Sequence, residues 1–580
     1  MGQLLVTTSI EDSWDPNLCT VFLGEWCKKS NRHHIWSKIE ADVAAPYGLE
    51  LNQKVRDNDE KHEFYDALLL ELSSKLNAFH QTDYSIRYWT ILIGPWLDSF
   101  MMVVMNRYKS LEVALDSFQI SKTILINQKD FSLTRNNYSE FRKAINSDLW
   151  NNALYVEILK NMDNQNVEIL VKNIDNSKSN KDKVEFSLKS FFKKIVFKIF
   201  EFCSFLSRNN DAFIINSYLP ILDEIKLKIL LGQIPIFWKS PELDYNFLSD
   251  VELDRDNINL EFKEYIGVER ELRRLIGRLI PKIYIEGYEF MCKQANNLKW
   301  PTNPKFIYTS NNFTADDLFK FWLGSQVEQG TLYYAGQHGA NYGTHFASKN
   351  WAELNTVDRF YSWGWQDVYQ DTKTIPAFNF KVINKLNSTY KKDGSLLLVE
   401  RSPGTRDGIH DRFYETWSSH KEMLKLYGLL SKAAQKNLLV RMHHRSSDFL
   451  SWQTKYQSLK IDAGKVDIFK IIKKSRLAVF NYDSAGLLEL LALNIPVVCF
   501  WDKDSNHLLP QSKKYYNLLK SVNILFDSPS QVADHINVNW DDIDSWWYSS
   551  EVQDARIEFC KQYSKVIKNP VNSLKNLLLL

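Results

Sequence analysis

Residues 481–502 read NYDSAGLLELLALNIPVVCFWD, and this stretch determines the fold that we expect. It ends one apolar run, passes through a polar turn, continues with helical spacing and enters a β-branched run, which makes one βαβ unit. Backbone N–H groups and the positive end of the helix dipole meet at such a turn, so Ser484 is a candidate phosphate contact. Glu489 follows five residues later, where a carboxylate could reach ribose hydroxyls. A capped structural helix with a solvated glutamate explains these residues equally well.

The same alternation of strands and helices surrounds this unit. Apolar runs predict strands at 395–400, 437–440, 465–469, 477–480, 497–500 and 522–526. They indicate a doubly wound domain whose polar groups collect at the carboxyl edge of the sheet. The candidate donor-binding residues at that edge are Arg401, Arg441, His443, His444 and Ser484, with Glu489 one helical turn further on.

The N-terminal part of the chain carries a candidate base and a candidate anion contact. Apolar strands at 4–8 and 20–24 lead into Glu25, which is a candidate general base. A helix N-terminal carboxylate, or a partner for Arg32, explains Glu25 as well. Arg87 stands among the aromatic residues of an apolar helix, so we expect it to bind a protein carboxylate or an anionic acceptor.

A third group follows the strand expected at 331–335. This strand runs directly into Gly336-Gln-His-Gly-Ala-Asn-Tyr-Gly343. Glycines let the backbone approach a ligand closely, and the segment lies at the end of a strand. His338 is therefore a candidate catalytic residue, and its neighbours Gln337 and Gly339 are candidate donor contacts.

The length and composition indicate a folded α/β protein of more than one domain. At 580 residues the chain exceeds the size of a single core, and 44% of its residues are hydrophobic. We expect an acceptor-side α/β domain with helical insertions at 1–371, a linker at 372–392 and a nucleotide-donor domain at 393–547. The segment 548–580 is expected to be helical and could cross back to the N-terminal domain.

The composition also disfavours several classes of protein. The 72 basic and 70 acidic side chains nearly cancel, which argues against a nucleic-acid partner. Six scattered cysteines form no C-x-x-C pair, so we expect a reduced cytoplasmic protein without a zinc site. No signal peptide and no membrane span are expected. The helix expected at Phe186–Phe202 carries lysines and could contact the inner membrane peripherally, although a buried helix is favoured.

The candidate residues suggest transfer of a group from an activated nucleotide. Guanidiniums, imidazoles, a hydroxyl and a helix N-terminus would stabilise a nucleotide leaving group without a metal or another cofactor. The sequence contains neither a Walker loop nor a G-x-G-x-x-G fingerprint, which disfavours ATPases and dehydrogenases. For sugar transfer, two Rossmann-like α/β domains that face a cleft form the GT-B architecture.

Five segments resemble a bacterial family of transferases encoded in O-antigen and capsule loci. They extend over most of the chain, at 20–27, 88–97, 337–343, 362–365 and 488–498. The second half is similar, more distantly, to GT-B transferases that use CMP-activated ulosonic acids, namely Kdo and pseudaminic or legionaminic acid. In those enzymes a basic-x-His-Pro element and a serine element with a following glutamate bind the CMP donor. The resemblance implies this role for Arg441, His443, Ser484 and Glu489, although His444 replaces the proline.

The leading hypothesis is a metal-independent glycosyltransferase of lipopolysaccharide or capsule biosynthesis. It would move a sugar from a CMP-linked donor to a glycan or a lipid-linked glycan, in the cytoplasm or at the inner membrane. His338 would lie near the reacting carbon, and Glu25 would deprotonate the acceptor. Two alternatives stay open: a nucleotide-sugar epimerase of similar fold, and a non-catalytic glycan-binding protein on a degenerate transferase fold.

Overall fold

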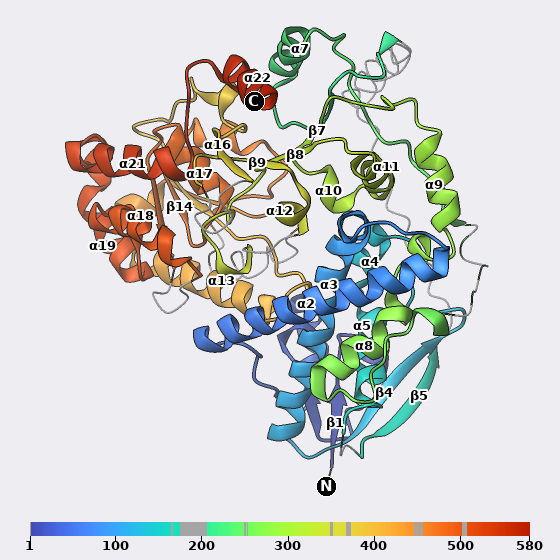
Figure 1. Ribbon diagram of the computed structural model, residues 1–580. Coiled ribbons are helices and arrows are strands. Elements are labelled where there is room, and N and C mark those ends of the chain that lie inside the picture. The colour runs from blue at the N-terminus through green and yellow to red at the C-terminus, as the bar shows by residue number, and fades with distance from the viewer. Residues whose placement is uncertain are drawn as a thin grey trace.

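A computed structural model describes most of the chain: residues 2–163, 166–174, 206–246, 248, 251, 253, 255–348, 352–366, 373–445, 452, 456, 458–501 and 507–580. Within these residues the protein contains three parallel sheets with helices packed around them (Figure 1). The α/β class expected from the sequence is confirmed. The helix expected at Phe186–Phe202 lies outside the described residues.

The first sheet is built from the N-terminal part of the chain. Its strands follow the order β3-β2-β1-β4-β5, with β1 at Gln3–Val6, β2 at Thr20–Phe22, β3 at Ala41–Val43, β4 at Ile120–Gln128 and β5 at Glu168–Ile174. Two long helices, α2 (Leu51–His80) and α3 (Ile86–Ser117), connect β3 to β4, and α5 (Asp148–Leu159) follows β4.

The second sheet also falls within the region that we expected to form one acceptor-side domain. Its order is β10-β9-β8-β7-β6, with β6 at Phe213–Ile215, β7 at Ile307–Thr309, β8 at Tyr333–Gly336, β9 at Arg359–Ser362 and β10 at Thr374–Pro376. Residues 1–371 therefore carry two sheets. The edge strand β10 lies in the stretch 372–392 that we expected to be a linker.

The third sheet contains the unit on which the sequence analysis began. Its order is β13-β12-β11-β14-β15-β16, with β11 at Ser395–Val399, β12 at Leu438–Arg441, β13 at Lys460–Asp462, β14 at Ser475–Phe480, β15 at Val497–Phe500 and β16 at Leu525–Phe526. The strand expected at 465–469 was placed too late. Asp467 caps helix α16 (Ile468–Ile472) there by accepting a hydrogen bond from the Phe469 N–H.

The apolar runs of the third sheet reflect burial on both of its faces. Leu397 and Val399 of β11 join the large core that extends through the first and second sheets. Leu396 and Leu398, which point to the opposite face, join a separate core. A strand covered on both faces has no polar alternation, which explains why the sequence identified these strands by apolar runs alone.

Helix α3 joins the first and second sheets. It packs against α2, α5 and α8 (Gly267–Leu279), and also against α11 (Asp317–Glu328) and α12 (Ala352–Thr356). By length and composition α3 could cross a membrane, but 83% of its most apolar window is buried inside the protein. Most large apolar side chains of α3 are buried, Trp89 and Trp96 completely, whereas Ile86 at its N-terminus is exposed.

The C-terminal segment forms two helices, α21 (Ser550–Tyr563) and α22 (Pro570–Leu579). Helix α22 packs against α7 (Ile221–Leu230), which follows the second sheet's first strand (Figure 1). The Tyr361 hydroxyl donates to the Leu577 carbonyl at 2.9 Å. The chain thus returns from the third sheet to the second.

Candidate functional site

The turn after β14 has the predicted geometry. Ser484 is extended and caps helix α17 (Ala485–Ala492), because its Oγ accepts a hydrogen bond from the Leu487 N–H at 3.1 Å. Its hydroxyl hydrogen is not used by this contact and is shared with the Tyr482 phenol, so a ligand at the N-terminus of the helix would compete with Tyr482 for this donor. Strand β14, helix α17 and strand β15 form the βαβ unit that the sequence predicted.

Glu489 is buried and paired, so a solvated glutamate is excluded. Its side chain is 9% exposed, and Oε2 accepts a hydrogen bond from Lys385 Nζ at 2.8 Å. Lys381 Nζ lies 3.8 Å from the other carboxylate oxygen. Both lysines belong to the expected linker, and the sequence analysis missed them. They place two positive charges one helical turn from Ser484.

His338 lies after β8, as expected, and is connected to Lys381 through Tyr218. Its ring stacks on Tyr218 with 6.2 Å between centroids, and Lys381 Nζ lies 5.4 Å from the centre of the Tyr218 ring. Burial is the main cause that lowers the pKa of His338 to about 4, and the positive charge of Lys381 is the second cause. The backbone of Ser310 hydrogen-bonds to the ring and partly offsets this shift. The imidazole is therefore neutral near pH 7.

The backbone beside His338 adopts an unusual conformation. Asn216 and Tyr218, which follow β6, have φ angles of 53° and 60°. The left-handed region is costly for an aromatic residue and is found mainly where the surroundings enforce it, often at functional sites. Asn311, which follows β7, donates a hydrogen bond to the Tyr218 hydroxyl at 2.9 Å. The carboxyl ends of three neighbouring strands thus contribute to one cluster.

Two further residues, Tyr342 and Glu353, extend this cluster inward. The Tyr342 hydroxyl lies 3.1 Å from His338 Nδ1 and donates to Glu353 Oε2 at 2.6 Å. Burial raises the pKa of Glu353 to about 7, against the lowering effect of the Tyr342 hydrogen bond. His338 is thus hydrogen-bonded, through one hydroxyl, to a carboxyl group that can change its charge near neutral pH.

The loops after β8 and β15 join the second and third sheets. His345 and Leu508 form an antiparallel bridge, and the Leu509 N–H donates to the Thr344 carbonyl at 2.7 Å. The rings of His345 and His507 stack, and His507 Nε2 lies 3.3 Å from Asp483 Oδ2. Asp483 directly precedes Ser484, so this contact fixes the turn against the second sheet.

Arg401 occupies the predicted position after β11, next to β14 in the sheet. Burial lowers its pKa, and Glu415 of α13 (Arg412–Leu429) lies 3.7 Å away. The Tyr482 phenol interacts with both Arg401 and Ser484. Strands β12, β11 and β14 are neighbours, which brings their terminal residues to one edge as predicted.

Arg441 does not present its guanidinium to that edge freely. It pairs with Asp462 at 2.5 Å and donates to the Val466 carbonyl at 2.7 Å, so it fixes the end of β13 and the following loop. A phosphate would have to compete with these contacts. His443 is half-buried, and burial lowers its pKa, as does the neighbouring His444, which is exposed.

Gln337 is enclosed by protein contacts, whereas Gly339 faces open space. The Gln337 amide oxygen accepts from the Trp363 backbone and the Trp365 indole, both at 2.8 Å, and its amide nitrogen donates to Gly339. Gln337 is buried and its amide holds the loop, so a donor would have to compete with these contacts, and its role as a donor contact stays a prediction. A Cβ at Gly339 would meet nothing within 4 Å, so open space lies beside that residue.

Glu25 and Arg87 have protein partners outside this cluster. Glu25 follows β2 of the first sheet and pairs with Lys28 at 3.1 Å, whereas Arg32 pairs with Glu11. Glu25 therefore lies at a different sheet edge from His338. Arg87 pairs with Asp358 at 2.8 Å, which favours the protein carboxylate over the anionic acceptor that we had considered.

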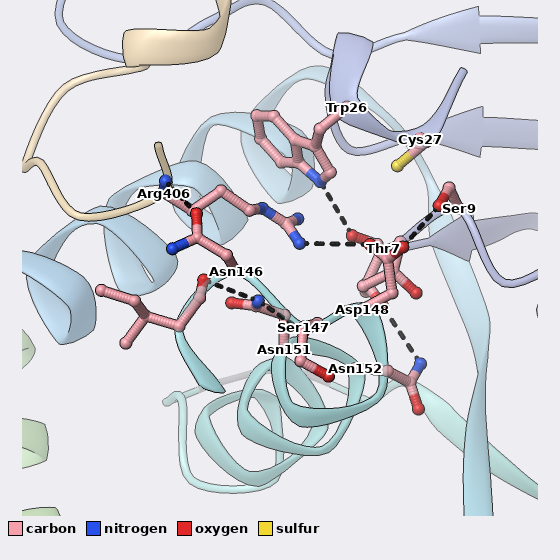
Figure 2. A network of polar contacts seen from close by, with 12 residues as sticks. Thr7, Ser9, Trp26, Cys27, Asn146, Ser147, Asp148, Asn151, Asn152 and Arg406 are labelled. Carbon is pink, nitrogen blue, oxygen red and sulfur yellow. Dashed lines mark hydrogen bonds and ion pairs between the residues drawn. The ribbon is translucent and has the colours of Figure 1, made fainter. Parts of the chain in front are cut away.

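The first sheet's carboxyl edge is filled by the protein itself (Figure 2). Arg406, from the loop after β11, lies 3.4 Å from Asp148 and 5.1 Å from the centre of the Trp26 ring. Asp148 also accepts from Ser9 and Lys29, each at 2.6 Å. A segment next to the third sheet thus docks at the position where a parallel sheet commonly binds a ligand.

The described residues contain no group of three or more His, Cys, Asp or Glu side chains that could hold a metal ion. The junction of the second and third sheets carries cations and hydroxyls together with carboxylates. The cations and hydroxyls are Lys381, Lys385, Arg401, Ser484 and Tyr218, beside the neutral His338, and the carboxylates are Glu489, Glu415 and Asp483.

Comparisons with known proteins identify a family. A model of the LIC12162 family of transferases matches residues 3–578, so the chain belongs to that family. No curated protein matches the chain. The similarity to solved structures is remote, as three of them illustrate. The wall teichoic acid polymerase TagF is 14% identical with a TM-score of 0.30, and the match covers 50% of this chain and 83% of TagF. MurG of Acinetobacter baumannii is 10% identical with a TM-score of 0.34, and the match covers 64% of this chain and 99% of MurG. The spinosyn rhamnosyltransferase SpnG, complexed with spinosyn aglycone, is 8% identical with a TM-score of 0.28, and the match covers 50% of this chain and 80% of SpnG.

Proposed function

We propose that this member of the LIC12162 family of transferases is a metal-independent glycosyltransferase with a GT-B arrangement of its second and third sheets. Its donor would be a CMP-activated ulosonic acid, and its acceptor a bacterial surface glycan or its lipid-linked precursor. One observation carries the proposal. Lys381 connects the His338–Tyr218 cluster of the second sheet to Glu489 of the third, so one site is built from both.

The nucleotide would bind at the third sheet. Negative phosphate oxygens fit the N-terminus of α17 and the Ser484 hydroxyl, with Arg401 on the neighbouring strand end. Lys381 and Lys385 supply positive charge that Glu489 only partly neutralises. When the bond between the sugar and the phosphate breaks, these groups would stabilise the charge that develops on the departing nucleotide.

The acceptor would react at the second sheet. His338 is neutral, so one ring nitrogen can accept the proton of the acceptor hydroxyl as its oxygen attacks the anomeric carbon. An anionic donor would offset the charge of Lys381 and raise the pKa of His338, which strengthens the base in the loaded site. This assignment replaces Glu25, which lies at the first sheet and is paired with Lys28.

A thermal-shift panel of CMP, CDP, UDP and GDP tests the donor class. We expect CMP to raise the melting temperature most, and Ser484→Ala to reduce that increase. Release of CMP from a CMP-activated ulosonic acid, with and without a glycan acceptor, tests the reaction. A preference for UDP would overturn the donor, and no response to any nucleotide would favour a glycan-binding protein without activity.

A further inference from the structure

Glu353 is a buried carboxyl group that the proposed mechanism does not use. It lies in α12, its residue is 5% exposed, and its Oε1 has no hydrogen-bond partner within the described part of the chain. A carboxyl group in such a place is destabilising when ionised, because no cation pairs with it there. A structural role would be served as well by an apolar residue of similar size. Its one short contact, to Tyr342, leads to His338.

The loop holds Tyr342 between these two groups. Asn341 and Gly343 have positive φ angles of 76° and 68°, which turn the chain on each side of Tyr342. The Tyr342 ring is 3% exposed and stacks on Phe360 of β9 at 5.2 Å between centroids. Its hydroxyl is therefore held in place, and only its hydrogen is free to change direction.

We propose that Glu353 and Tyr342 are positioning residues that determine which ring nitrogen of His338 carries the proton. The inference rests on the role of His338 in the proposed function. When Glu353 is ionised, the Tyr342 hydroxyl donates to the carboxylate and its oxygen accepts from His338 Nδ1–H. Nε2 then carries a lone pair and can act as a base.

Protonation of Glu353 reverses both hydrogen bonds. The carboxylic acid donates to the Tyr342 oxygen, Tyr342 donates to Nδ1, and the ring proton moves to Nε2 by exchange with solvent. One proton is taken up, on Glu353, and the imidazole stays neutral. The Ser310 backbone contact to the ring involves a carbonyl, which accepts only from a ring N–H and so favours the tautomer that carries its proton on the nitrogen facing Ser310. Tyr342 is the contact that can either donate to the ring or accept from it.

The surroundings of Glu353 leave it free to titrate. The ionisable groups that interact with Glu353 are Tyr342 and Tyr333 of β8, and Arg87 of α3 in turn interacts with Tyr333. Both phenols have pKa values raised by burial and stay protonated, and the charge of Arg87 is paired with Asp358. Glu353 is thus the group in this set that changes charge near neutral pH.

Nuclear magnetic resonance of protein with ¹⁵N-labelled histidine tests this directly, with His338→Gln used to assign the signal. We expect the His338 resonances to change from the Nε2–H to the Nδ1–H tautomer as the pH rises through about 7. Glu353→Gln should abolish this change and lower turnover about tenfold above pH 7. Tyr342→Phe should also abolish it, while circular dichroism confirms folding.

The outcomes distinguish the hydrogen-bond relay from Glu353 through Tyr342 to His338 from the proposed catalytic role of His338. A tautomer that ignores pH in the unaltered protein, or a change that survives in Glu353→Gln, would overturn the relay even if His338 is the base. A pH-dependent tautomer with turnover that does not depend on His338 would uphold the relay and overturn the catalytic role of His338.

Discussion

The carboxyl edges of the first and second sheets differ in what fills them. At the first, Asp148 lies beside Ser9 and Arg406 (Figure 2) and also pairs with Lys29, so negative and positive charges offset each other. At the second, His338 is neutral and Glu353 is buried with no cation paired to it in the described structure. A parallel sheet gathers polar groups at its carboxyl edge in both cases. Position at a sheet edge alone therefore does not identify a site, whereas a buried carboxyl group without a paired cation is a more specific indicator.

Substitution of the candidate base at each sheet edge should give the largest difference in turnover between the two edges. His338→Gln is expected to lower turnover by about 10²- to 10⁴-fold, because it removes the proton acceptor. Glu25→Gln removes only a partly exposed ion pair with Lys28 and should leave turnover within about twofold. The measurement is CMP release from the donor in the presence of acceptor. Equal losses of turnover in both variants would contradict the assignment of the base to the second sheet.

Neutralisation of Asp148 should affect stability instead of binding. Burial would raise the pKa of Asp148, but Arg406 and Lys29 outweigh it and lower the pKa. Asp148→Asn leaves the Arg406 guanidinium, whose side chain is 9% exposed, without its carboxylate. We expect a loss of about 3 kcal/mol in the free energy of unfolding by urea. Because the pKa is lowered in the folded state, this contribution is present above about pH 4 and should vanish as the pH falls below it. An unchanged unfolding midpoint at pH 7 would show that the edge is not closed by this pair.

Neutralisation of Glu353 should increase the free energy of unfolding, whereas neutralisation of Asp148 lowers it. Its pKa is raised, so ionisation opposes folding once the pH exceeds the value of an unfolded glutamate, near 4.5, and the effect is complete above about 7. Glu353→Gln should therefore stabilise the protein by about 2 kcal/mol at pH 8 and much less at pH 5. Urea unfolding at the two pH values checks this. Destabilisation at both would mean that the carboxylate has a partner that it needs.

Removal of the Lys381 charge should have the smallest effect, a modest loss of nucleotide affinity. Lys381→Met leaves Glu489 paired with Lys385 and is expected to weaken nucleotide binding about tenfold, the contribution of one charged contact. Calorimetric titration with CMP provides the measurement, and Lys28→Met at the first edge is the matched control. A similar loss in both would contradict a local role for Lys381.

The sequence predicted well what depends on short segments. The βαβ unit, the Ser484 cap and the strand before His338 each follow from local periodicity and composition. The sequence did not reveal the division of residues 1–371 into two sheets, because long helices separate their strands. Lys381, Lys385 and Tyr218 were missed for a related reason. Their roles come from contacts between segments more than a hundred residues apart, which no local pattern records.

Three candidate residues whose polar groups already have protein partners support the same conclusion. Arg87 and Arg441 are cations near strand or helix ends, yet each is paired with a protein carboxylate, Asp358 or Asp462. Gln337 stands beside His338 in sequence, but its amide is used by Trp363 and Trp365. Only the three-dimensional partners distinguish a group that is available to a ligand from one that already holds the fold together.

Two serines at the two edges allow the most direct test. Ser484 caps α17 at the third sheet, opposite the His338 cluster, and Ser9 follows β1 at the first sheet. Calorimetric titration of CMP into Ser484→Ala and Ser9→Ala compares them under identical conditions. We predict that binding weakens at least tenfold in Ser484→Ala and is unchanged in Ser9→Ala. Weakened binding in Ser9→Ala with normal binding in Ser484→Ala would place the nucleotide at the first sheet and contradict the account.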